Sequence, residues 1–296
     1  TAVEPLDDIY MNDNNDWAQK MSLADFWAAA ATVAIEYAVA LSDAETTFEL
    51  PLYFGRQDCT DSPDIAINST IPKDLDALFT FGFDDIIAFF ANDLNFTTQE
   101  TIAIMGVNGL GIRLLGDYEA MTTIFDGEFA INSDTFDNAY FTSLVDNEWI
   151  SVDGISDSYW RQRGGTYSML NTDITLAWDI DDLFNTSTNE YDCIVNKASN
   201  SLSSKPECSR RVFSTDIIDT YVYSNQVLLD DFAKLWTKLV TTGYDNSELR
   251  DDVFISTETP ETTEADAAYR TEILYHTIIS IFIVVTTIYC AINDEY

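Results

Sequence analysis

Histidine is almost missing from this sequence of 296 residues. The only one, His276, lies in an apolar run near the C-terminal end. A Ser-His-Asp catalytic arrangement is therefore excluded, and no cysteines and histidines stand at the spacing of a zinc site. A glycine-rich phosphate-binding loop is also missing. A lone histidine in an apolar run is typical of a packed residue rather than of a ligand.

Basic residues are scarce as well. The chain has 14 Lys and Arg against 51 Asp and Glu, which gives a net charge of −37. Such a charge repels phosphate backbones, so a nucleic-acid partner is excluded. Acidic surfaces can hold Ca²⁺ loosely, because hard cations prefer oxygen ligands. No dense Asp-x-Asp-x-Asp-Gly loop is present, however, and we predict no specific metal site.

The chain has only four cysteines, and two of them bracket a polar loop, "CIVNKASNSLSSKPEC". If Cys193 and Cys208 pair, the closed loop of about 15 residues contributes roughly 3 kcal/mol in the chain-entropy model. A disulfide indicates an oxidising compartment. Asn68, Asn95 and Asn185 each begin an N-x-S/T sequon and are candidate glycosylation sites. Together these signals favour a secreted or cell-surface protein.

The C-terminal part of the chain changes in composition. We divide the sequence into a helical domain over residues 1–244, an acidic Thr- and Glu-rich linker over 245–270, and an apolar segment over 271–296. Residues 273–292, "ILYHTIISIFIVVTTIYCAI", contain no acid, Lys or Arg, and 20 residues suffice to span a bilayer. The richness in Ile, Val and Thr also suits an element buried against another subunit. Both interpretations, membrane anchor and assembly segment, stay open.

Hydrophobic periodicity predicts several helices. Residues 22–41 form the strongest, with Ser22 and Asp25 in a capping-box pattern. Its apolar residues at helical spacing are Leu23, Phe26, Trp27, Ala30, Val33, Ala34, Tyr37 and Leu41. A helix from residue 98 to Gly106 opens with a second capping box, Thr97 to Glu100, and another helical stretch is broken near Gly82. Residues 227–240 are amphipathic, and their apolar face consists of Leu228, Phe232, Leu235, Trp236 and Leu239.

The order of segments over roughly residues 5–244 resembles the plant-type haem peroxidases, most closely the ascorbate-peroxidase and cytochrome-c-peroxidase branch. "SLADFWAAAATVAIEYA" is similar to the helix "S-x-ADF-x-LA-x-x-x-A-x-E", and "LYFGRQD" to the loop "YGR-x-D". "TTQETIAIMGVNGLG" resembles "VAL-x-G-x-HT-x-G", and "FDGEFAINSDTFDNAYFTSLV" resembles "GPWT-x-NP-x-x-FDN-x-Y". "YSMLNTDITLAWD" resembles the stretch "L-P-x-D-x-x-L-x-x-D", and "FAKLWTKLVTTGY" resembles the closing helix that ends "KL-x-x-LGF". Six segments in the right order carry the resemblance.

The resemblance implies a mostly α fold of about ten helices around a haem cleft. It also assigns a degenerate haem pocket. The position of Asn108 is the family's iron-ligating histidine, and the position of Asp173 is the carboxylate that hydrogen-bonds to that histidine. Phe129 stands where the family has tryptophan, and Gly109 stands where it has threonine. An asparagine amide is a poor ligand for ferric haem, so no cofactor is expected.

The family's distal pattern "R-x-x-W-H" is not found in the sequence, so we expect the domain to lack its N-terminal distal helices. The leading interpretation is a pseudoenzyme, inactive as a peroxidase, with a structural or adhesive role at the cell surface or in an extracellular assembly such as a filament. The alternative is a haem-binding enzyme whose distal half is a separate chain from the same precursor.

The expected partners are that N-terminal fragment or neighbouring copies, with the membrane as a further option. Without the distal helices, an apolar face that includes some of Phe26, Trp27, Phe89 and Phe90 would be exposed to water, and either partner would cover it. Arg56 and Asp58 are expected to form a structural salt bridge.

Overall fold

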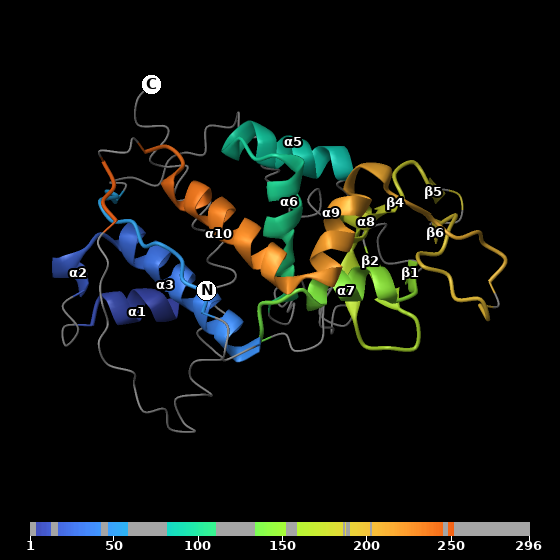
Figure 1. Cartoon of the computed structure of the whole chain (residues 1–296), viewed down its shortest axis with the longest axis horizontal. Helices are drawn as coiled ribbons and strands as arrows, with labels where there is room; N and C mark the ends of the chain where they lie inside the picture. Colours follow the sequence, from blue (N-terminus) through green and yellow to red (C-terminus); the bar gives the residue numbers. More distant parts are fainter. Residues whose placement is uncertain are drawn as a thin grey trace. The chain divides into compact units, whose positions relative to one another are not determined.

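The computed structural model describes residues 4–12, 17–42, 47–58, 82–110, 134–151, 159–185, 187, 190–201, 203–244 and 248–251. Phe129, Asn68 and the apolar segment 273–292 lie outside these residues. The helices are α1 Glu4–Tyr10, α2 Trp17–Lys20, α3 Leu23–Ser42, α5 Phe83–Leu94, α6 Thr98–Met105, the 3₁₀ helix η1 Gly106–Gly109, α7 Ala139–Asp146, α8 Asn171–Ala177, α9 Val212–Tyr223 and α10 Asn225–Thr241 (Figure 1). The strands are β1 Trp149–Ser151, β2 Tyr159–Gln162, β3 Ser168–Leu170, β4 Trp178–Asp179, β5 Phe184–Asn185, β6 Glu190–Tyr191 and β7 Ser209–Arg210.

Helices dominate the described residues and the strands are short, which confirms the predicted mostly α fold. The chain forms two compact units. Unit 1 combines residues 1–68 with 233–296, and unit 2 comprises residues 69–232. Helix α10 begins in unit 2 and ends in unit 1. The predicted linker and apolar segment begin near the end of the described residues, so this division stays a prediction.

In unit 1, the N-terminus of α3 is capped by a residue far along the chain. The carboxylate of Asp58 accepts the backbone N–H groups of Leu23 and Ala24 at 3.0 and 2.9 Å. The Ser22 hydroxyl accepts the N–H of Asp25 at 3.0 Å, which is one half of the predicted capping box. The other half is not formed, because the Asp25 carboxylate turns to a different partner.

That partner is Arg56. The buried guanidinium of Arg56 donates to Asp25 at 2.8 Å, and the backbone N–H groups of Gly55 and Arg56 donate to the same carboxylate at 2.8 and 3.2 Å. Arg56 also donates to the carbonyl oxygen of Val240 in α10. The prediction of an Arg56–Asp58 pair is therefore wrong. A buried guanidinium needs a buried counter-charge, and Asp25 supplies it, whereas the exposed Asp58 is left to cap α3.

The predicted apolar face of α3 is rotated from the one that is buried. Val33 and Leu41 are 53% and 47% exposed. The buried residues are Ala24, Asp25, Phe26, Ala28, Ala31, Thr32, Ile35, Ala38 and Val39. Small side chains on this face leave room for bulky neighbours. The fully buried Trp236 of α10 donates its indole N–H to Thr32 at 3.0 Å.

The expected open face at Phe26 and Trp27 is also corrected, because α1 lies against α3 (Figure 1). Leu6 and Tyr10 of α1 form a buried cluster with Phe26, and Trp27 packs partly buried against it. The rings of Tyr10 and Phe26 lie 5.3 Å apart. Helix α1 thus covers this apolar surface at Phe26 and Trp27.

In unit 2, α6 begins as predicted. Thr97 accepts the N–H of Glu100, and the Glu100 carboxylate accepts the N–H of Thr97 at 2.7 Å, so the capping box is complete. The helix tightens at its end into η1, which packs on α7. A Cβ atom at Gly109 would lie 3.0 Å from the Cβ of Tyr140. Because glycine has no Cβ, η1 can approach α7 this closely, and Asn108 therefore lies next to α7.

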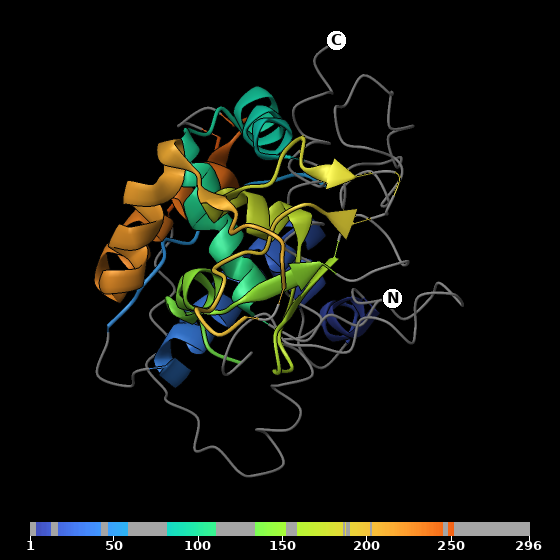
Figure 2. The ribbon, with the colours of Figure 1, turned by 90° about the vertical axis from the view of Figure 1, so that its right-hand side faces the viewer.

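Strands β1, β2 and β3 form an antiparallel sheet (Figure 2). In its register, Trp149 pairs with Gln162 and Trp160 pairs with Met169. A disulfide joins Cys193 to Cys208, as predicted. The predicted face of α10 is confirmed, because Leu228, Phe232, Leu235, Trp236 and Leu239 are all fully buried.

Candidate functional site

The structure brings together the two residues that the family resemblance paired. The side-chain amide of Asn108, in η1, donates to the Oδ1 atom of Asp173, in α8, at 2.9 Å. Asp173 is fully buried and Asn108 is half-buried. The two residues are 65 positions apart in the chain. The contact that the resemblance predicts between these two positions is therefore present, with an amide as the donor.

Asp173 has further donors. The hydroxyl of the buried Tyr140, in α7, donates to the same Oδ1 atom at 2.8 Å. The backbone N–H of Leu170 donates to Oδ2 at 2.9 Å, which caps the N-terminus of α8. The carboxylate therefore joins η1, α7 and α8. A backbone N–H group and two side chains satisfy it together.

The electrostatics of this cluster keep Tyr140 protonated. Burial raises the pKa of Tyr140 well above its usual value of 10.0, and the neighbouring Asp173 carboxylate raises it further through charge repulsion and the hydrogen bond. A protonated phenol has one O–H to give, and it is given to Asp173. The phenol thus acts as a hydrogen-bond donor to Asp173 rather than as an acid poised to give up its proton.

The residues do not fit an iron-bound haem of the family type. Imidazole binds iron through a nitrogen lone pair, whereas the amide nitrogen of Asn108 acts as a donor toward Asp173. Its amide oxygen is a weak ligand for ferric iron. Among the described residues, no group of three His, Cys, Asp or Glu side chains is arranged to hold a metal ion.

Phe129, the third residue of the predicted pocket, and Asn68 lie outside the described residues. Asn95 is exposed at the C-terminal end of α5, and Asn185 is half-buried in β5. Tyr140 was missed by sequence reasoning. The signal was in the motif "FDN-x-Y", which the resemblance aligned with residues 136–140, but the motif gave this tyrosine no role.

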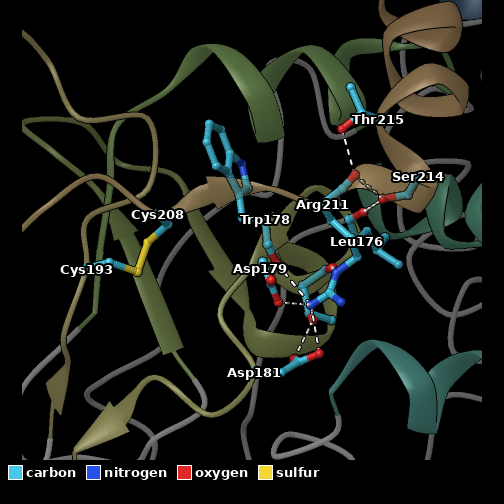
Figure 3. A network of polar contacts seen from close by, with 10 residues as sticks. Leu176, Trp178, Asp179, Asp181, Cys193, Cys208, Arg211, Ser214 and Thr215 are labelled. Carbon is cyan, nitrogen blue, oxygen red and sulfur yellow. Dashed lines mark hydrogen bonds and ion pairs between the residues drawn. A yellow bond between two sulfur atoms is a disulfide. The ribbon is translucent and has the colours of Figure 1, made fainter.

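A second polar cluster fixes the position of α8, and it too was missed. Arg211, at the start of α9, donates to the backbone carbonyl of Thr175 at 2.7 Å and pairs with Asp181 at 2.7 Å and with Asp179 at 3.3 Å (Figure 3). Ser214 donates to the carbonyl oxygen of Leu176. Because these groups bind the last turn of α8, they hold the helix that carries Asp173. The pair "RR" at residues 210 and 211 in so acidic a chain could have signalled this cluster.

Comparison with known proteins identifies the family. A sequence model of the family described as Peroxidase matches residues 1–201, about two thirds of the chain. The chain belongs to the peroxidase family. This membership confirms the resemblance to the plant-type haem peroxidases, and the branch within that superfamily stays a prediction.

A curated relative points the same way. The chain is 26% identical over 133 residues to a Debaryomyces hansenii protein named "Putative heme-binding peroxidase". The match covers 44% of this chain and 28% of the relative, so the chain spans just over a quarter of that protein's length. What that name says about haem applies to the relative.

Within the described residues, one helix, α3, has the length and apolar composition to cross a membrane. More than half of its apolar window is buried in the structure, as in the core helix of a folded domain. The predicted anchor at 273–292 lies outside the described residues and stays a prediction.

Proposed function

We propose that this peroxidase-family chain is a pseudoenzyme with a structural or adhesive role at the cell surface or in an extracellular assembly. The observation that carries the proposal is the hydrogen bond from the Asn108 amide to Asp173. In the family, as the resemblance implies, this carboxylate makes an iron-bound imidazole a better donor. Here it accepts an amide, a phenol and a backbone N–H group.

The chemistry supports a structural role for the cluster. Hydrogen bonds to a charged acceptor stabilise by roughly 1.5–3 kcal/mol each, so three of them make Asp173 a strong link between η1, α7 and α8. Peroxidase chemistry without its iron ligand would be slower by orders of magnitude, because each increase of about 1.36 kcal/mol in the activation barrier lowers the rate about tenfold. Under this proposal the Asp173 cluster serves to hold the helices together, and position 108 supplies no iron ligand.

The location and assembly follow from separate signals. The disulfide between Cys193 and Cys208 supports an oxidising compartment. The apolar residues 273–292 would anchor the chain in a membrane or pack on a neighbouring copy, as in a filament. A cleaved fragment of the same precursor is the other candidate partner.

Two observations favour the alternative function. The retention of Asp173, together with a curated relative named for haem binding, fits a haem-binding enzyme whose distal half is a separate chain. The two functions differ in an absorption spectrum.

Haemin titration tests the proposal directly. The full chain is titrated with haemin alongside Asn108→His and a matched control, Asn200→His, which adds a histidine at an exposed asparagine in the disulfide loop. We expect no stoichiometric Soret band for the wild type or for Asn200→His, and a band for Asn108→His. A stoichiometric band with peroxide turnover by the wild-type chain overturns the proposal. Equal bands in the two histidine variants would show surface binding and remove the assignment of Asn108 to a haem-type pocket.

A further inference from the structure

The turn between α5 and α6 presents two polar side chains to solvent from a rigid frame. Asn95 is exposed, in the left-handed conformation with φ of 52°, directly after the last residue of α5. Leu94 and Phe96 on either side are 5% and 4% exposed. The ring of Phe96 stacks on that of Phe90 with centroids 5.8 Å apart, and its backbone N–H donates to the carbonyl oxygen of Phe90 at 3.1 Å. The inward Leu94 and Phe96 fix the outward direction of Asn95.

The exposed residues of this turn form a glycosylation sequon, Asn95-Phe96-Thr97, in which Thr97 is also exposed. The second sequon among the described residues differs. Asn185 is half-buried, its amide N–H group donates weakly to Asp192 at 3.3 Å, and its side-chain oxygen accepts the N–H of Ser187 at 3.0 Å. A glycan needs an open path to solvent in the folded chain, and Asn95 is the better placed of the two.

A structural explanation exists for each residue of the sequon at 95–97. Asparagine is one of the few residues that adopts the left-handed conformation readily, and Thr97 is the N-cap of α6. These structural roles can be tested separately from glycosylation, because other residues can fill the same roles. Glycine suits the left-handed position, and aspartate suits the N-cap.

We propose that Asn95 carries an N-linked glycan. The Nδ2 atom of Asn95 forms a bond to the anomeric carbon of a sugar, the bond from that carbon to the oxygen of a diphosphate donor breaks, and the amide loses one proton. The proposal rests on the secretory location in the proposed function. The sugar would cover the α5–α6 turn and add a hydrophilic surface at the N-terminal end of the helix that leads to Asn108.

The test uses the full chain made in a eukaryotic secretory host with a cleavable leader. Tryptic peptides are mapped before and after treatment with a peptide N-glycosidase, which converts a glycosylated asparagine to aspartate. Four variants are compared: Asn95→Gly, Thr97→Asp, Thr97→Ser and Asn185→Gln. Asn95→Gly and Thr97→Asp keep the turn and the cap but destroy the sequon, whereas Thr97→Ser keeps all three.

We expect the wild type, Thr97→Ser and Asn185→Gln to carry a glycan at residue 95, and Asn95→Gly and Thr97→Asp to lose it with little change in thermal unfolding. An unmodified Asn95 in the secreted, disulfide-bonded wild type overturns the proposal, as does a glycan at Asn185 with Asn95 bare. Either result leaves the haemin titration unaffected. Failure of this inference is therefore distinguishable from failure of the proposed function.

Discussion

Replacing Asp173 with alanine should destabilise unit 2 severely. The substitution removes the acceptor of three hydrogen bonds and leaves their donors in place. Two of these donors, the Tyr140 hydroxyl and the Leu170 N–H group, belong to residues that are 1% and 5% exposed. Each orphaned buried donor costs about 1–3 kcal/mol, so the two together should cost about 2–6 kcal/mol. Water can reach the half-buried Asn108, so its amide adds little.

That loss is large against a total stability of about 5–15 kcal/mol for a typical domain. The measurement is urea unfolding with the disulfide intact, followed by tryptophan fluorescence, because the fully buried Trp149 and Trp160 report on unit 2. The dependence of the unfolding free energy on urea concentration must match that of the wild type, because two compact units can unfold in separate steps. We expect the midpoint of the unit 2 transition to fall.

The control is Tyr140→Phe, which removes one donor and keeps the ring. In the double variant with Asp173→Ala, the phenol is no longer orphaned, so the combined loss should fall short of the sum by about 1–3 kcal/mol. A loss below about 1 kcal/mol for Asp173→Ala, or strict additivity in the cycle, would refute the view that these hydrogen bonds stabilise unit 2.

Three further predictions concern other parts of the chain. Gly55→Ala should destabilise the fold strongly, because the added Cβ would lie 2.5 Å from a backbone carbonyl oxygen. Gly164→Ala should cost only about 1 kcal/mol of backbone strain, because no atom lies within 4 Å of the added Cβ. The melting temperatures of the two variants test this difference. Changing Cys193 and Cys208 to serine should lower the free energy of unfolding by about 3 kcal/mol in urea titrations, and an unchanged urea midpoint would contradict the entropic argument. Burial, with repulsion from a neighbouring acid, raises the pKa of Glu36 above 4.5, so its ionisation weakens the fold as pH rises through that raised value. Glu36→Gln should therefore raise the melting temperature at pH 7 but not at pH 4, and an equal gain at both would be inconsistent with this titration.

Features set by neighbouring residues were predictable from the sequence. The capping box of Thr97 and Glu100 lies within one helical turn, and it is formed as expected. The amphipathic face of α10 was also predicted, because large apolar residues at helical spacing leave only one face to bury. The buried face of α3 was not predicted correctly. Alanine has little preference for burial or exposure, so the element that packs on α3 decides which side is buried. There the partner is Trp236, and its indole binds Thr32.

The mostly helical fold and the kinship with peroxidases could be predicted from the sequence, because both depend on patterns along the chain. The placement of Asn108 at the family's ligand position stays a prediction. The contacts of Asn108 could not be predicted in this way, because Asp173 and Tyr140 come from other helices and meet it only in the folded chain. Arg56 illustrates the same limit. The nearest acid in the chain, Asp58, caps a helix, while the buried guanidinium pairs with Asp25, 31 residues away. Charges pair according to burial and direction in space, and distance along the chain specifies neither.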